Sequence, residues 1–112
     1  MTRVLASAAL FAILGFADTA RAHDWYSGTT NRAGQNCCNT YDCQQVSGEL
    51  IEEVRGGFMI RLKPGQHIMV STPVEHFVPY RDLQASPDNK WHVCLFPNQD
   101  TVRCFFGPVG GS

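Results

Sequence analysis

The chain has 112 residues, and nine Lys and Arg against ten Asp and Glu give it a formal net charge of −1 at pH 7. No basic cluster occurs along the sequence, which disfavours nucleic acid as a partner because that binding depends on Lys and Arg neutralising phosphates. A chain of this length has room for a single hydrophobic core.

The first 22 residues have the pattern of a secretory signal peptide. Arg3 provides a positive start, residues 4–16 form an apolar run, and residues 20–22 read Ala-Arg-Ala, the small-x-small form that signal peptidases recognise. The run is shorter than the roughly 20 residues that a helix needs to cross a bilayer. We therefore expect residues 1–22 to be cleaved off, and a periplasmic or secreted protein with no membrane span after cleavage.

Residues 23–112 are the expected mature protein, a single small domain stabilised by disulfides. A domain of this size buries little apolar surface, so covalent cross-links become valuable. Its cysteines are candidates for such cross-links in an oxidising compartment, namely Cys37, Cys38, Cys43, Cys94 and Cys104. Two bridges leave one cysteine over, which either stays a thiol or pairs between molecules.

Residues 23–45 predict an irregular N-terminal arm, because Gly, Asn, Thr, Ser and Cys dominate them. Short runs with strand character follow at residues 50–54, 58–62 and 67–71. Turn residues separate them: Gly56-Gly57 suits a tight hairpin, and Pro64-Gly65 suits a type II turn. This succession is typical of an antiparallel meander.

Prolines at 73, 79 and 87 interrupt the next stretch, where residues 75–78 could make a short edge strand and residues 80–85 a loop or one helical turn. Residues 91–96 and 101–106 then predict a final hairpin. A three-residue loop would place Cys94 opposite Cys104 on the two strands. The same register would place His92 opposite Phe106, and Phe96 opposite Val102.

The sequence thus predicts a mainly β fold, a small antiparallel sheet of two hairpins with a disulfide-tied irregular N-terminal arm. The expected core consists of Leu50, Val54, Phe58, Ile60, Leu62, Ile68, Val70, Val93 and Leu95. We favour Cys94–Cys104 and Cys38–Cys43 as the bridges. The competing arrangement ties Cys37 or Cys38 to the last hairpin, which would fix an arm that has few apolar residues of its own.

Several short motifs recur together in a known group of proteins. They are His23-Asp24-Trp25-Tyr26 after the leader, Cys37-Cys38 with Asp42-Cys43, Ser86-Pro87-Asp88 before His92-x-Cys94, and Cys104-Phe105-Phe106-x-Pro108. With these motifs the chain resembles small exported cysteine-rich bacterial proteins of unknown function, over most of its mature length. The resemblance implies export and carries over no catalytic residue. Residues 27–36 depart from that pattern, being longer and more polar.

Cleavage at the predicted site would make His23 the N-terminal residue, with a free amine beside its imidazole. Such a pair can chelate Cu(II), and a second imidazole from His67, His76 or His92 could complete the site. His67 also shares a predicted strand face with Met69, which could add a thioether. The alternative is that these histidines are ordinary solvated residues without a ligand role.

Nucleophilic chemistry has little support in the sequence. His92 and Cys94 could be drawn as base and nucleophile, but residues two apart on a strand lie about 7 Å apart and point in parallel directions. No Cys-x-x-Cys, phosphate-binding loop or hydrolase motif is present. The chain is therefore more easily interpreted as a protein other than an enzyme.

A zinc site of Cys37, Cys38, Cys43 and a histidine can also be drawn. Adjacent cysteines seldom both bind one tetrahedral ion, and export favours disulfides. We therefore expect no resident cofactor, with copper as the exception to test.

Two aromatic groups carry the functional prediction: Trp25 with Tyr26 at the start of the mature chain, and Phe106 with its neighbours in the last hairpin. They either fill the core, with Trp25 packing the arm onto the sheet, or form an exposed surface that anchors a partner. The leading prediction is an exported non-catalytic binding module whose partner is unknown. The alternative is copper binding or handling through His23.

Overall fold

The computed structural model describes residues 25–38 and 41–108. The predicted signal peptide, its cleavage site and His23 lie outside the described residues. The strands in the described part are β1 (Cys43–Val46), β2 (Ile51–Val54), β3 (Gly57–Leu62), β4 (Val74–Pro79), β5 (Leu83–Ala85), β6 (Trp91–Leu95) and β7 (Val102–Gly107). Two short 3-10 turns, η2 (Gly48–Leu50) and η3 (Tyr80–Asp82), separate some of them. The predicted mainly β class is confirmed.

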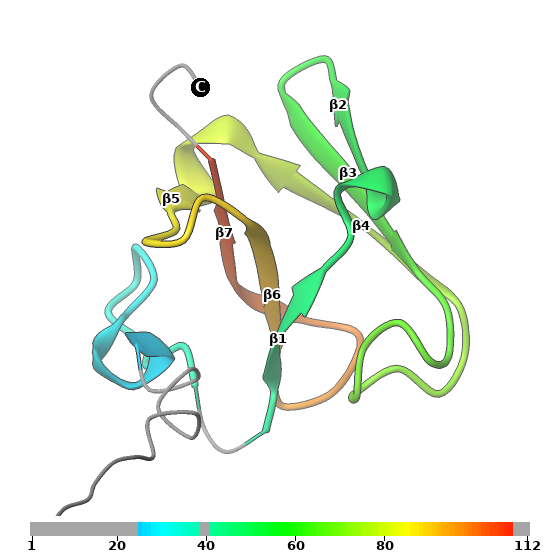
Figure 1. Ribbon diagram of the computed structural model, residues 1–112, viewed down its shortest axis with the longest axis horizontal. Helices are drawn as coiled ribbons and strands as arrows, with labels where there is room; N and C mark the ends of the chain where they lie inside the picture. Colours follow the sequence, from blue (N-terminus) through cyan, green and yellow to red (C-terminus); the bar gives the residue numbers. More distant parts are fainter. Residues whose placement is uncertain (1–24, 39–40, 109–112) are drawn as a thin grey trace, which may run out of the picture.

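The strands are arranged in two sheets (Figure 1). One has the order β1-β6-β7-β5 and the other the order β2-β3-β4. Neighbouring strands run antiparallel, except that β5 lies parallel to β7. The chain passes from the first sheet to the second through η2 and returns through η3. The predicted hairpins are thus present, but they belong to two sheets and not to one.

Gly56 and Gly65 lie in the first two turns as predicted, whereas Gly57, expected in the hairpin turn with Gly56, is the first residue of β3. Gly56 has a φ of +86°, and the β2–β3 register leaves a two-residue loop before Gly57. Gly65 has a φ of +93°, and the Gln66 N–H donates to the Lys63 carbonyl oxygen at 2.9 Å, which defines a type II turn. Both positions require the left-handed conformation that glycine adopts without strain.

Residues 67–71 do not form the predicted strand. The Val70 N–H donates to the His67 carbonyl oxygen at 3.0 Å, so the backbone curls there and is not extended. As a result His67 and Val70 both face inward, whereas Ile68 points outward and is 65% exposed. The prediction of Ile68 as a core residue was therefore wrong, because the expected strand over residues 67–71 does not form.

Two strands were not expected. Residues 43–46, at the end of the predicted arm, form β1 and pair with β6, although Gln44 and Gln45 give them a polar composition. Residues 83–85 form β5, a short strand parallel to β7. The predicted edge strand at 75–78 is confirmed and extends over Val74–Pro79, and η3 is the single turn expected after it.

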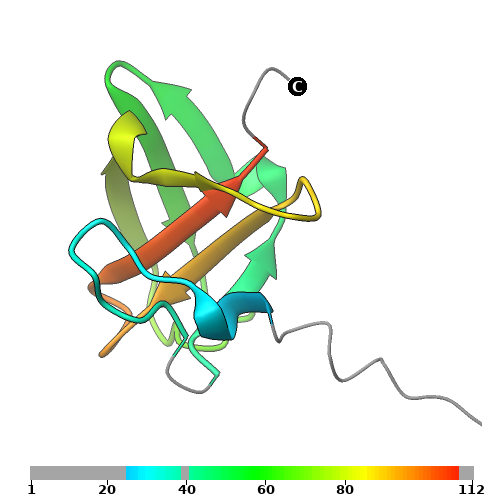
Figure 2. The ribbon, with the colours of Figure 1, turned by 90° about the vertical axis from the view of Figure 1, so that its left-hand side faces the viewer.

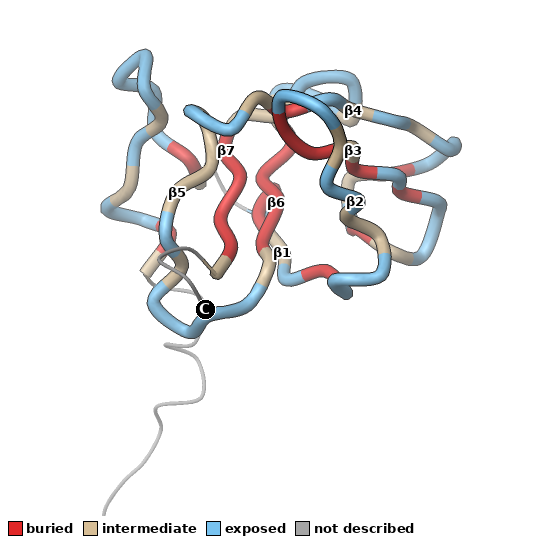
Figure 3. Tube along the Cα trace, turned by 90° about the horizontal axis from the view of Figure 1, so that it is seen from above, coloured by how far each residue is buried: buried red, intermediate tan, exposed pale blue. Residues whose placement is uncertain are grey.

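The main core lies between the two sheets and contains buried side chains from both, namely Val46, Phe58, Ile60, Leu62, Val70, Val78, Val93, Leu95 and Phe105. Most of the predicted core residues are among them, while Leu50 and Val54 are half-buried. The N-terminal arm covers the opposite face of β6 and β7 (Figure 2). Because one face meets the core and the other meets the arm, these two strands are buried along most of their length (Figure 3).

The last hairpin has most of its predicted register. Cys94 lies opposite Cys104 and His92 opposite Phe106, as expected. Val102, however, pairs with Leu95, because the register shifts between Cys94 and Leu95. The predicted pairing of Phe96 with Val102 was therefore wrong, and a β-bulge is the reason.

Candidate functional site

Two disulfides fasten the arm and β1 to the central strands. Cys37 of the arm is bonded to Cys104 of β7, and Cys43 of β1 to Cys94 of β6. The favoured pairs Cys94–Cys104 and Cys38–Cys43 were therefore wrong, and the competing arrangement, with Cys37 tied to the last hairpin, is confirmed. Cys94 does face Cys104 across the hairpin, but β1 lies on its other side and supplies its bonding partner.

Cys38 belongs to neither bridge. Its sulfur, a carboxylate oxygen of buried Asp42 and the Cys43 sulfur all lie within 4.8 Å of one another. Cys43 is bonded to Cys94, so only Cys38 and Asp42 could offer a metal ion a ligand while that bridge is intact. The zinc site drawn from Cys37, Cys38 and Cys43 does not assemble, because Cys37 and Cys43 are both in disulfides.

A buried hydrogen-bonded chain joins the arm to β6 and to the turn before it. The Tyr26 hydroxyl lies 2.8 Å from Nδ1 of His92, and Nε2 of His92 lies 2.9 and 3.0 Å from the Asp88 carboxylate oxygens. The Trp25 ring meets the His92 ring edge-on at 4.8 Å. Both ring nitrogens of His92 are thus engaged, and a metal ion would have to displace one of these hydrogen bonds.

The charges in this chain follow from its surroundings. Burial, with smaller contributions from Asp88 and Cys38, raises the pKa of Tyr26 to about 12, so its hydroxyl is a neutral donor. Partial burial acts to raise the pKa of Asp88, but hydrogen bonds from His92 and the Lys90 N–H outweigh it and lower that pKa. A neutral phenol and an ionised carboxylate therefore lie on either side of the imidazole.

Both ring nitrogens of His67 also form hydrogen bonds within the fold. Its Nε2 donates to the Val93 carbonyl oxygen at 2.8 Å, and its Nδ1 accepts the Met69 N–H at 3.1 Å, an arrangement that fits the neutral ring. Burial lowers its pKa, against smaller opposing effects of the Val93 hydrogen bond and Asp42. His67 and Met69 do not share a strand face, because no strand forms there. With His23 outside the described residues, copper binding stays a prediction.

The aromatic side chains proposed as a binding surface are mostly internal. Tyr26 and Phe106 are each 2% exposed, and Trp25 is half-buried. The Trp25 ring packs on both, with centroids 4.5 Å from Tyr26 and 5.0 Å from Phe106. The core-filling interpretation is confirmed, and neither Tyr26 nor Phe106 offers a partner an exposed ring.

A pocket of about 240 Å³ opens instead where the arm crosses between the two sheets. It is lined by residues 31–33 of the arm, residues 77–79 of β4, Asp82 of η3 and residues 102–105 of β7. Phe77 is one of the lining residues and is 49% exposed. Segments far apart in the sequence build this pocket, and no local motif could have revealed it.

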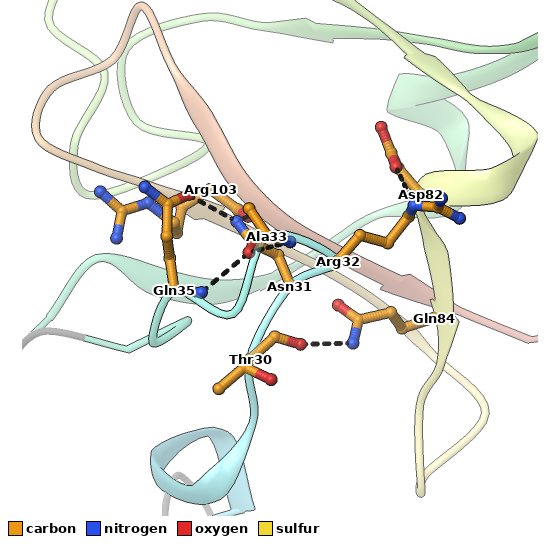
Figure 4. A network of polar contacts seen from close by, with 8 residues as sticks. All are labelled: Thr30, Asn31, Arg32, Ala33, Gln35, Asp82, Gln84 and Arg103. Atoms are coloured by element: carbon orange, nitrogen blue, oxygen red, sulfur yellow. Dashed lines mark hydrogen bonds and ion pairs between the residues drawn. The ribbon is translucent and has the colours of Figure 1, made fainter.

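The arm loop at the pocket is held in shape by Asn31 (Figure 4). Its Oδ1 accepts the N–H groups of Ala33 and Gln35 at 2.9 and 3.0 Å, and its Nδ2 donates to the Arg103 carbonyl oxygen at 2.9 Å. The loop is therefore fixed both within itself and to β7. Sequence reasoning missed Asn31, since a single polar residue in an arm rich in such residues gives no signal.

Charged side chains stand at the rim of the pocket. Arg32 of the arm pairs with Asp82 of η3 at 3.7 Å, and both side chains are well exposed. The Arg103 guanidinium lies 4.9 Å from the Phe96 ring centroid. Its Nη1 also donates to the Asn36 carbonyl oxygen at 3.4 Å, and neither Phe96 nor Asn36 lines the pocket. The pocket thus combines the Arg32 cation and the Asp82 carboxylate with apolar walls.

Comparison with known proteins adds no relative: no family model, curated protein or solved structure matches this chain. Within residues 25–38 and 41–108, no helix is long and apolar enough to cross a membrane.

Proposed function

We propose that the protein is an exported, non-catalytic binding module whose partner occupies the pocket between the arm loop, β4 and β7. The observation that carries this proposal is the pocket itself, with its apolar walls, charged rim and pre-shaped arm loop. Small binding sites typically combine apolar walls with a few placed polar groups. The two disulfides support export, because such bridges persist mainly in oxidising compartments.

The rim favours a partner that presents a carboxylate next to an apolar side chain. The Arg32–Asp82 pair is exposed and 3.7 Å long, so it contributes little and Arg32 can exchange it for a carboxylate of the partner. Phe77, 49% exposed, offers an apolar anchor beside it. A segment of a partner protein with an acidic residue beside an aliphatic or aromatic one fits this combination.

The lining groups support binding more than catalysis. The titratable side chains at the pocket are Arg32, Asp82 and Arg103, and Cys104 is bonded to Cys37. Such groups can hold a charged ligand, whereas a nucleophile with an adjacent base would be needed for covalent catalysis.

Site-specific photocrosslinking in an envelope extract of the native host tests the proposal. A photoreactive phenylalanine derivative replaces Phe77, and the matched control places it at Ile68, an exposed apolar residue outside the pocket. We expect a discrete cross-linked species from position 77 that unlabelled protein competes away and that Arg32→Glu weakens. Equal cross-linking from both positions, or no effect of Arg32→Glu, would argue against the pocket as the site.

A further inference from the structure

Three cysteines lie side by side on adjacent strands of the four-stranded sheet. Cys43 on β1 is the register partner of Cys94 on β6, which in turn is the partner of Cys104 on β7. Cys43 and Cys94 are bonded to each other, and Cys37 of the arm is bonded to Cys104. The fifth sulfur, that of Cys38, lies within 4.8 Å of the Cys43 sulfur. A thiol therefore stands beside an existing disulfide.

We propose that Cys38 takes part in thiol–disulfide exchange with the Cys43–Cys94 bridge. The Cys38 thiolate attacks the Cys43 sulfur, the bond between Cys43 and Cys94 breaks, and a bond between Cys38 and Cys43 forms. Cys38 is oxidised and Cys94 is reduced, so no external oxidant or reductant is consumed. The proton that Cys38 loses to solvent is matched by the proton that the Cys94 thiolate takes up. The Asp42 carboxylate, within 4.8 Å of the Cys38 and Cys43 sulfurs, disfavours a second negative charge there, so the exchange should be faster at alkaline pH.

Burial and position identify Cys43 as the sulfur that is attacked. Cys94 has no exposed surface, whereas Cys43 lies at the end of β1, is 8% exposed and has Cys38 beside it. Attack at Cys43 also makes Cys94 the leaving group, which stays on β6. The Cys37–Cys104 bridge takes no part, so the arm remains fastened to β7 throughout.

The two bridged forms differ in what they hold together. The Cys43–Cys94 bond spans 51 residues and ties β1 to β6, whereas a Cys38–Cys43 bond closes only a short loop. Bridges across longer loops constrain the unfolded chain more, so we expect the Cys43–Cys94 form to dominate. Exchange would release β1 from its covalent link to β6. It would also move the thiol from Cys38, at the end of the arm, to Cys94 on the buried strand β6. This activity is independent of the proposed binding function.

Trapping the thiol after exchange in the oxidised, folded chain tests the proposal. The folded protein is equilibrated at mildly alkaline pH and quenched in acid to stop the exchange. It is then unfolded in acidic guanidinium chloride with N-ethylmaleimide, so that a buried thiol is labelled as well, digested with pepsin and mapped by mass spectrometry. We expect the single label to be divided between Cys38 and Cys94, with a Cys38–Cys43 bridge in every chain that is labelled at Cys94. In the matched Cys38→Ser variant the Cys94 label should be lost, although its own bridge is untouched. Label confined to Cys38, or Cys94 labelled equally in Cys38→Ser, would overturn the proposal.

A second variant, Cys94→Ser, removes the cysteine that competes with Cys38 for the Cys43 sulfur. In Cys94→Ser the exchange geometry leaves Cys38 and Cys43 adjacent, so mild air oxidation should join them and leave no titratable thiol. Two thiols that persist in the oxidised variant would overturn the proposal. The Cys37–Cys104 bridge, mapped in the same digest, serves as the internal check that the arm is still in place.

Discussion

The Tyr26 hydroxyl lies 2.8 Å from Nδ1 of His92 and links the start of the arm to a strand 66 positions further along the chain. On the other side of the ring, Nε2 of His92 faces the Asp88 carboxylate, which accepts hydrogen bonds when it is ionised. The proton of the neutral ring therefore belongs on Nε2, and Nδ1 accepts from Tyr26. The arm is thus held by a hydrogen-bonded chain as well as by the Cys37–Cys104 disulfide.

Replacing Tyr26 with Phe should destabilise the fold although the ring is kept. Without the hydroxyl, Nδ1 of His92 is left buried with no donor, which costs about 1–3 kcal/mol. Urea unfolding of the disulfide-intact protein measures the loss. Tyr41→Phe is the matched control, because Tyr41 is 77% exposed and its hydroxyl is accessible to water. Equal unfolding free energies for the two variants would contradict the role given to Tyr26.

His67 should make the fold sensitive to mild acid. Its pKa is lowered below the ordinary 6.5, mainly by burial, so the unfolded chain binds a proton that the folded chain resists. The contribution to stability is complete above pH 6.5 and is lost as the pH falls below it, with a slope of up to about 1.4 kcal/mol per pH unit. NMR titration of the ring should show that Nδ1, which accepts the Met69 N–H, is still largely unprotonated at pH 6.5. A ring that titrates at or above 6.5 would refute the assignment.

Asp88 should contribute in a different range of pH. Its pKa is lowered below 3.8, so its charge stabilises the folded state above that value, and the stability is lost as the pH falls through the lower folded pKa. Asp88→Asn should therefore reduce the unfolding free energy at neutral pH and have little effect in strong acid. Unfolding curves of both proteins over the acid range test this. A difference that persists unchanged in strong acid would point to packing and not to charge.

The fold was largely predictable where local sequence decides the backbone. The short run with strand character at residues 58–62 located β3, and glycines at 56 and 65 marked the turns, because these signals depend on neighbouring residues alone. Residues 67–71 imitate a strand, but burial of His67 against the Val93 carbonyl curls the backbone. β1 has the polar residues of a loop and is a strand because β6 supplies its hydrogen-bonding partner. Such tertiary effects leave no trace in a short window of sequence.

The site was less predictable, because its parts come from distant positions. Composition indicated two bridges among five candidate cysteines, but it did not identify Cys38 as the cysteine outside them. The pairing depends on β1 lying next to β6, which the sequence did not reveal. Trp25 and Tyr26 were recognised as important side chains, and burial then decided that they fill the core. The pocket needs Arg32 and Phe77 together, and only the folded chain brings them to one place.

Gly107 should not tolerate a side chain. A Cβ at this position would collide with the Trp91 ring, which packs flat against the end of β7. Gly107→Ala should therefore cost about 1–3 kcal/mol through overpacking. Gly28→Ala is the matched control, because nothing lies within 4 Å of the place where its Cβ would be. Thermal unfolding should separate the two variants, and equal melting temperatures would show that Trp91 can move aside.

Removing the Cys37–Cys104 bridge should cost more than any single hydrogen bond, because this bridge spans 67 residues and its loss frees the unfolded chain. The double variant Cys37→Ser/Cys104→Ser should lose about 2–5 kcal/mol of unfolding free energy. Cys38→Ser is the control, because it replaces a cysteine of the same segment that belongs to neither bridge. The aromatic cluster of Trp25, Tyr26 and Phe106 depends on the arm staying in place, so its near-ultraviolet circular dichroism should weaken in the double variant alone. An unchanged spectrum would mean that the hydrogen-bonded chain through His92 holds the arm without the disulfide.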